Sequence, residues 1–228
     1  MKSVAYRITL FPSVITPLTE ELIMRYITIL GDLKYLPSVN RGVTVKMTGP
    51  DKFSTENIYT LDLRNSDNGV SVSVTAERID FVSDGNIDLD SFSGVAFTLI
   101  AIMYSMNPSG YNRLAAGAVF NEEYSWNDLE KNIGNSTMLP FGPQNVEWSE
   151  RAALRKDFKP NGSESVILYN DVTSIYVNRR DDGLYDYKNE LDVNTAIPQP
   201  VDLVNRFRTE FFTMALRLIN DKTIVSNE

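Results

Sequence analysis

The sequence contains no cysteine and no histidine among its 228 residues. Without cysteine the chain has no disulfide bond, no thiol nucleophile and no thiolate zinc site. Without histidine it has neither a Ser-His-Asp triad nor an imidazole that exchanges protons near neutral pH. Catalysis would therefore depend on carboxylates, lysine, tyrosine, serine or threonine, and this favours a protein that is not an enzyme.

Glycine and proline are also scarce, with 12 and 10 residues, while 43% of the residues are hydrophobic and 23% are charged. These proportions are typical of globular proteins and exclude disordered and fibrous classes. The formal net charge is −8. A negative charge of this size disfavours non-specific attraction to nucleic acids and to anionic membranes.

The sequence also lacks a hydrophobic run long enough to form a membrane-spanning helix. The longest apolar stretch, residues 92–106, contains Ser93, Gly94 and Thr98, and it is shorter than the roughly 20 residues that span a bilayer. It predicts a buried helix instead. The N-terminus reaches Arg7 and Pro12 without an apolar segment of the signal-peptide type. We therefore expect a cytoplasmic protein that does not associate with membranes.

Hydrophobic periodicity predicts similar elements in both halves of the chain. In the first half we expect strands over residues 4–11, 42–47, 58–63 and 70–75, and helices over 19–31 and 89–106. In the second half we expect strands over 113–120, 146–156, 166–177 and 184–193, and helices over 125–134 and 201–220. Asn68-Gly69 and Asp182-Gly183 indicate a tight hairpin turn in each half, because glycine adopts positive φ without strain.

Each half thus has the order β-α-β-β-β-α. The sequence predicts an α+β fold in which one antiparallel sheet carries two long helices on one face. Residues 1–110 and 111–228 would be the two halves of one continuous structural unit. We expect the apolar helix over 89–106 to lie deepest.

Two resemblances accompany this pattern. The element order is similar to the duplicated fold of the TATA-box-binding protein, which implies a shared topology rather than a shared function. Tyr111-Asn112-Arg113-Leu114 and Leu191-Asp192-Val193-Asn194-Thr195 resemble segments of a sporadically distributed family of uncharacterised bacterial proteins. That resemblance implies a bacterial source and a setting in a mobile element or a defence system.

Five basic residues in the second half form the candidate binding site: Arg151, Arg155, Lys156, Arg179 and Arg180. Arg151 and Arg155 alternate with Ala153 along a strand, so both guanidinium groups project from one sheet face, where they would hold phosphates or an acidic segment. The alternative is a solvated face whose charges are balanced by the acidic residues of the same strand. We favour this alternative, because most charge runs are solvated faces.

Carboxylates provide a second candidate. Asp157-Phe158-Lys159 and Asp186-Tyr187-Lys188, together with Asp51, resemble the acidic-x-Lys element of metal-dependent nucleases. The pattern is short enough to occur by chance, and we favour chance. Asp84, Asp88 and Asp90 lack the closing glutamate of a calcium loop and are expected to cap the following helix. We predict no catalytic residue, no metal and no cofactor, since no glycine-rich phosphate loop is present either.

The last helix carries an apolar stripe that includes Phe207, Phe211, Phe212, Met214 and Leu218. Such a stripe is usually core, and its breadth suggests that part of it joins a second copy of the chain. The leading prediction is a non-enzymatic protein-binding module or accessory subunit with a protein partner. Nucleic-acid association through Arg151 and Arg155 comes second, and a carboxylate-dependent metal enzyme comes last.

Overall fold

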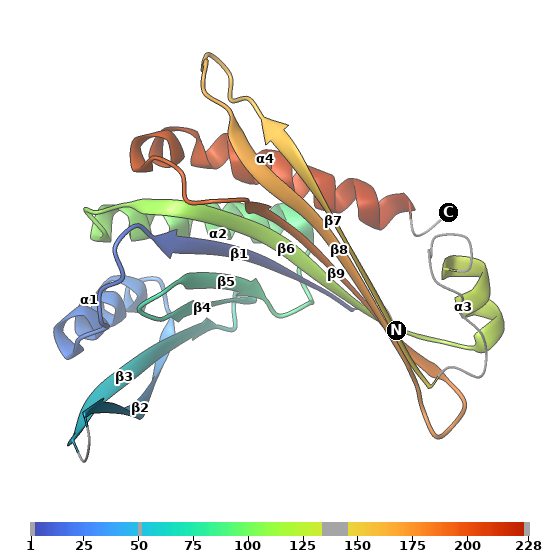
Figure 1. The fold of residues 1–228 in the computed structure, drawn as a ribbon, viewed down its shortest axis with the longest axis horizontal. Coiled ribbons are helices and arrows are strands. Elements are labelled where there is room, and N and C mark those ends of the chain that lie inside the picture. Colours follow the sequence, from blue (N-terminus) through green and yellow to red (C-terminus); the bar gives the residue numbers. More distant parts are fainter. Residues whose placement is uncertain (1–2, 50–51, 134–145, 226–228) are drawn as a thin grey trace.

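The computed structural model of the chain describes residues 3–49, 52–133 and 146–225. Its strands form one nine-stranded antiparallel sheet with the order β2-β3-β4-β5-β1-β6-β9-β8-β7 (Figure 1). The strands are β1 (Ser3–Pro12), β2 (Leu36–Gly49), β3 (Lys52–Asn65), β4 (Val70–Val74), β5 (Ile79–Ser83), β6 (Tyr111–Tyr124), β7 (Glu147–Phe158), β8 (Ile167–Arg179) and β9 (Tyr185–Thr195). The predicted α+β class with an antiparallel sheet is confirmed.

The helices are α1 (Glu20–Gly31), α2 (Leu89–Met106), α3 (Trp126–Ile133) and α4 (Val201–Val225). Two of them begin at capping side chains that the sequence indicates. Thr19 Oγ1 accepts a hydrogen bond from the backbone N–H of Leu22 at 3.3 Å, and Asp88 Oδ1 accepts one from that of Ser91 at 2.8 Å. Asp88 thus caps α2, as the sequence predicts.

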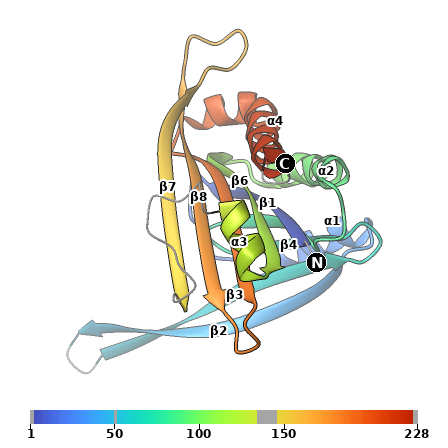
Figure 2. The ribbon, with the colours of Figure 1, turned by 90° about the vertical axis from the view of Figure 1, so that its right-hand side faces the viewer.

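All four helices lie against one face of the sheet. Figure 2 shows α1, α2 and α4 on the same side of the strands. Alternate residues of the strands point toward these helices, among them Ile8 and Leu10 of β1, which are fully buried. The smaller helix α3 places Leu129 against Trp148, Val177 and Tyr185 in a separate apolar cluster. The opposite face of the sheet therefore has no helix on it among the described residues.

Helix α2 is less enclosed than the sequence predicts. Its buried residues, Phe92, Ala96, Leu99, Ile100, Met103 and Met106, form one side, whereas Gly94, Thr98 and Ala101 are exposed. The sequence predicts a buried helix, and only the side of α2 that faces the strands is buried, because a helix in a single layer on a sheet has its other side toward solvent. By length and composition α2 is the described helix that qualifies to cross a membrane, and 33% of it is buried in the protein.

Helix α4 uses its apolar stripe for the core. Phe207, Phe211 and Phe212 are buried, and the rings of Phe211 and Phe158 meet edge to face at 6.1 Å. Met214 and Leu218 are partly buried and pack against the same core. The breadth of the stripe is therefore explained within one chain, and the homo-oligomer through this helix stays a prediction.

The first half of the sheet departs from the expected elements in two ways. It contains an additional short strand, β5, which pairs with both β4 and β1. The β2–β3 hairpin is also longer than expected, and β3 pairs with β4 only from Leu61 to Asn65. The outer part of this hairpin therefore extends beyond the sheet and exposes Val43, Val45 and Phe53.

The two predicted turns have glycine at positive φ, 64° at Gly69 and 82° at Gly183. Among the described residues other than glycine only Lys34 has positive φ, so Asn68 does not, contrary to the usual Asn-Gly turn. Instead the carbonyl of Asn65 accepts the N–H of Gly69 at 3.2 Å, and Asn65 Oδ1 accepts that of Asp67 at 2.8 Å. The side chain of Asn65 thus fixes a longer loop than the tight turn that the sequence indicates.

Candidate functional site

The sheet face opposite the helices, called the open face below, is built from the strand residues that alternate with the core. Around the centre of the sheet many of them are polar: Arg7 and Thr9 of β1, Asn121 and Glu123 of β6, Asp186, Lys188, Glu190, Asp192 and Asn194 of β9, Asn170, Tyr176 and Asn178 of β8, and Arg151 and Arg155 of β7. Ala115 and Val119 of β6 and Val172 of β8 lie on the same face. A half-buried antiparallel sheet normally leaves such a face to water or to a partner.

A row of interacting side chains crosses the open face from β1 to β7. Arg7 Nη2 lies 3.7 Å from Asp192 Oδ1, and Asp192 Oδ2 accepts a hydrogen bond from Asn194. Asn170 Nδ2 donates to Asn194 Oδ1 at 3.1 Å, and Arg155 Nε donates to Asn170 Oδ1 at 3.4 Å. The row orders five polar side chains from four strands and ends in an arginine on each side.

Gly117 of β6 lies beneath the first step of this row. It pairs with Arg7 on one side and with Asp192 on the other. A Cβ atom at Gly117 would be 2.8 Å from the carbonyl oxygen of Leu191 and 3.8 Å from Arg7 Nη2. The close approach of the Leu191 carbonyl therefore explains the glycine, while a Cβ atom would make only ordinary contact with Arg7 and Asp192.

The five predicted binding residues do not form one patch. Arg151 and Arg155 lie on the open face, as the alternation predicts, and both are exposed. Lys156 points to the helix face, where its Nζ lies 2.8 Å from Oδ2 of the buried Asp171. Arg179 is exposed at the end of β8. The structure thus brings together two of the five, and whether these bind a ligand stays a prediction.

Arg180 is surrounded by carboxylates. Its guanidinium group forms an ion pair with Glu123, lies 2.8 Å from Asp182 Oδ2 and lies 3.7 Å from Asp186 Oδ1. These charges, with Asp182 first, raise the pKa of Arg180 above its ordinary value. Since its charge is already balanced by three neighbours, Arg180 is a poor candidate for a phosphate site.

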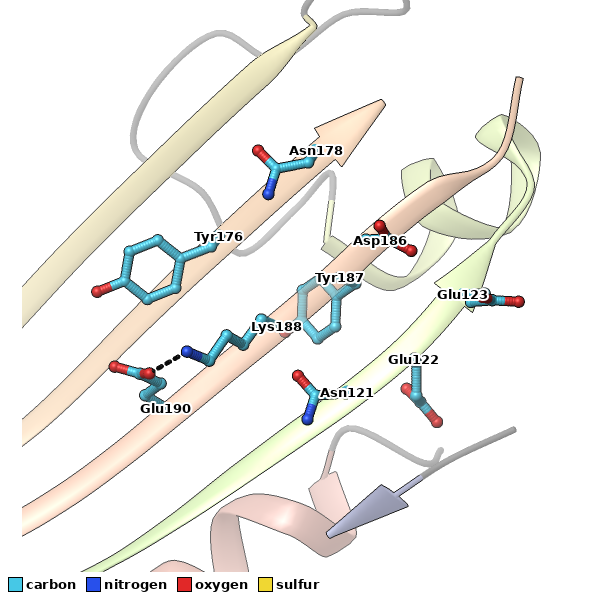
Figure 3. Close-up of a pocket in the computed structure, with 9 residues that line it drawn as sticks. All are labelled: Asn121, Glu122, Glu123, Tyr176, Asn178, Asp186, Tyr187, Lys188 and Glu190. Atoms are coloured by element: carbon cyan, nitrogen blue, oxygen red, sulfur yellow. Dashed lines mark ion pairs between the residues drawn. The ribbon is translucent and has the colours of Figure 1, made fainter. Parts of the chain in front are cut away.

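A shallow hollow of about 800 Å³ lies on the open face beside Arg180. Nine residues line it: Asn121, Glu122, Glu123, Tyr176, Asn178, Asp186, Tyr187, Lys188 and Glu190 (Figure 3). Lys188 Nζ is 2.5 Å from Glu190 Oε1 and 5.6 Å from the centre of the Tyr176 ring. The hollow thus combines one cation with several carboxylates, two amides and an aromatic surface.

The hollow was not predicted from the sequence. The sequence pattern that could have indicated the hollow is the alternation of Asp186, Lys188 and Glu190 along β9, which places three charged side chains on one face of the sheet. Neighbours from β6 and β8 complete the lining, and their register follows from the sheet order rather than from local sequence.

The carboxylate candidates form no metal site among the described residues. No group of three acidic side chains close enough to hold a metal ion occurs in this part of the chain. Asp88 is engaged as the cap of α2, and Asp84 Oδ1 accepts the N–H of Asn86 at 3.0 Å. Asp157 and Asp186 lie on β7 and β9, which β8 separates. Asp51 lies outside the described residues.

The sequence matches no protein-family model and no curated protein.

Proposed function

We propose that the protein is a non-enzymatic binding module, an accessory subunit that holds another protein on the open face of its sheet. The observation that carries the proposal is the contrast between the two faces. One face supplies a complete core beneath four helices, while the other presents an ordered row of polar side chains and a hollow without any described element on it. An uncovered polar sheet face with fixed side chains is suited to recognition.

The composition of the hollow supports a polypeptide as the ligand. A protein segment offers amides, charged side chains and apolar groups, and the hollow has matching acceptors, donors and an aromatic ring. The described residues contain no group of acidic side chains placed to hold a metal ion, and the sequence has no histidine or cysteine. These features give no support to a chemical step. A bacterial source and a mobile-element or defence setting rest on the family resemblance and stay predictions.

We also propose that residues 1–110 and 111–228 are related halves. The first runs β1-α1-β2-β3-β4-β5-α2, and the second runs β6-α3-β7-β8-β9-α4. In the sheet the two first strands, β1 and β6, are neighbours, and each half then continues outward in reverse chain order. This arrangement supports the topological similarity to the duplicated TATA-box-binding-protein fold, with β5 or its neighbour as an extra strand of the first half.

Affinity capture from the native host tests the binding proposal. The bait is the full chain, compared with Lys188→Glu on the open face and with Lys34→Glu as the matched control. Both lysines are exposed, and each pairs with one carboxylate, Glu190 at 2.5 Å and Asp67 at 3.4 Å. A protein recovered with the wild type and the control, but lost with Lys188→Glu, supports the proposal. Equal recovery by both variants contradicts it.

Nucleic-acid binding is the second candidate, because Arg151 and Arg155 share the open face and Arg155 belongs to the polar row. Capture of nuclease-sensitive material in place of a protein would favour this candidate.

A further inference from the structure

The two edges of the sheet are β2 and β7. Among the described residues β7 pairs only with β8, so no described strand lies beside its other edge from Arg151 to Asp157. Edge strands in natural proteins are usually protected by proline, by a bulge or by charges that oppose pairing. β7 contains no proline, and its register with β8 runs without a shift. Its protection would therefore depend on its charges.

The backbone groups that point outward come from the odd-numbered residues of β7. Arg179 N donates to Val146 O at 2.7 Å, and the register places these two residues opposite each other. In an antiparallel ladder the residues bonded to one neighbour alternate with those directed away from it. Because Val146 is bonded to β8, so are the other even-numbered residues, and Arg151, Ala153, Arg155 and Asp157 direct their N–H and C=O groups outward.

We infer that two copies of the chain pair through β7, antiparallel and centred on Leu154. In this register Arg151 of each copy lies opposite Asp157 of the other, so two ion pairs form on the open face. Neither side chain has an ion pair with another described residue of its own chain. The charges that would protect an isolated edge become complementary when two copies meet.

The exposed side chain of Leu154 supports a two-fold axis at this residue. It is 59% exposed in the middle of the strand, between Ala152, Ala153 and Arg155. Its backbone is bonded inward to β8, so the two Leu154 residues would form a pair without mutual hydrogen bonds, the kind in which side chains approach most closely. Pairing would remove both leucine side chains further from water, and the burial of apolar surface favours association.

Other registers and the other edge are less favourable. A two-fold axis at Ala153 places Arg151 opposite Arg155 twice; it also places Glu150 opposite Lys156, but the ammonium group of Lys156 is already paired with Asp171. An axis at Arg155 places that residue opposite its own copy. The other edge strand, β2, carries Arg41 and Lys46 as its charged residues, so self-pairing there would form no ion pair. The Arg151–Asp157 pairs and the exposed Leu154 together favour β7 and the Leu154 register.

Disulfide trapping tests the register directly, because the natural chain has no cysteine. Leu154→Cys places the new thiols of the two copies opposite each other, with Cα atoms about 4.5–5.5 Å apart, within the range of a disulfide. Ala152→Cys is the matched control: it lies on the same strand face, but its position is opposite Lys156 of the other copy. On mild oxidation we expect a covalent dimer from Leu154→Cys and at least tenfold less from Ala152→Cys. Equal trapping of the two variants overturns the register.

Charge reversal tests the interface in solution. Arg151→Asp and Asp157→Arg each set like charges opposite one another twice, so each should raise the Kd of the dimer at least about tenfold, which corresponds to about 1.4 kcal/mol. The double variant exchanges the charges and should restore the wild-type Kd. Sedimentation equilibrium measures all four proteins. A wild type that remains monomeric up to its solubility limit, or a double variant as weak as the single ones, overturns the inference.

Discussion

The Nζ atom of Lys156 lies 2.8 Å from Oδ2 of Asp171, whose side chain is only 3% exposed. Lys222, near the end of α4, reaches the other oxygen of Asp171 and lies 3.3 Å from Thr173 Oγ1. A buried carboxylate therefore joins the edge strand β7, its neighbour β8 and the last helix. This relationship gives Lys156 a partner within the chain, and the ligand-binding role that its position in a basic run suggests stays a prediction.

Replacement of Asp171 by asparagine should destabilise the fold by about 1–3 kcal/mol, because two ammonium groups lose their partner. Both lysines retain contact with water, which keeps the loss below that of a fully buried pair. Asp67→Asn is the control, since Asp67 forms an exposed pair with Lys34. Urea denaturation measures both changes. A loss at Asp171 no larger than at Asp67 would show that the buried pair contributes little.

The same pair predicts how stability depends on pH. Burial, the largest single influence, tends to raise the pKa of Asp171, but the hydrogen bonds from Lys156 and Lys222 outweigh it and hold the pKa below the ordinary value. Because the pKa of Asp171 is lower in the folded state, its ionised carboxylate stabilises the fold at pH values above the unfolded pKa of about 3.9. This stabilisation is lost as the pH falls through the folded pKa.

The hydrogen bond to Asp171 is the main cause of a raised pKa for Lys156. That contribution is complete below the unfolded pKa of about 10.4 and is lost as pH rises through the folded pKa. The stability difference between the wild type and Asp171→Asn should therefore be greatest between about pH 5 and 9 and should shrink toward both extremes. A difference that stays constant from pH 3 to 11 would contradict this account.

Gly69→Val should lower the melting temperature more than Gly183→Val. Both positions have positive φ, which costs a β-branched residue about 1–2 kcal/mol. At Gly69 a Cβ atom would also meet Asp84 Oδ1 and Ile87 Cγ2 at 3.0 Å, whereas nothing lies within 4 Å of one at Gly183. We expect a decrease of about 3–8 °C for Gly183→Val and a larger one for Gly69→Val, measured by calorimetry. An unchanged melting temperature for Gly69→Val would exclude the loop geometry described above.

The fold could largely be predicted from local sequence, and the site could not. Alternation in Val70–Val74 and the cap at Asp88 depend on neighbours in the chain, and both predictions hold. The row from Arg7 to Arg155 depends on which strands are adjacent, a property of the whole sheet. Lys156 shows the same limit: its strand is predicted correctly, but its partner Asp171 comes from β8 and becomes visible only with the register.

Gly117→Ala should weaken the centre of the sheet. The new Cβ atom would lie 2.8 Å from the carbonyl oxygen of Leu191, so β6 and β9 must separate slightly. We expect a loss of about 1–3 kcal/mol, typical of overpacking. Arg7→Gln is the comparison that removes the ion pair without a clash, and it should cost less than 1 kcal/mol. If both variants lose equal stability, then the ion pair between Arg7 and Asp192, and not the short distance to the Leu191 carbonyl, explains why glycine occupies position 117.

Reductant and EDTA should leave the melting temperature unchanged within about 1 °C. The sequence offers neither thiol nor imidazole, and the described residues hold no cluster of three carboxylates for a metal. A bound ion would stabilise the folded state by mass action and reveal itself as a decrease on chelation. A decrease of several degrees in EDTA would favour the carboxylate-dependent enzyme over the binding module.

Random-sequence DNA and RNA should give no retarded band with the protein at about 150 mM salt, where weak phosphate contacts are largely screened. The net charge is −8, and the acidic hollow lies on the same face as Arg151 and Arg155. If a band appears, Arg151→Glu combined with Arg155→Glu separates the two functions. Both residues are exposed, so the double variant should keep its circular dichroism spectrum. A band that weakens steeply with salt and disappears in this variant would place nucleic-acid binding ahead of protein binding, because each neutralised phosphate releases counterions.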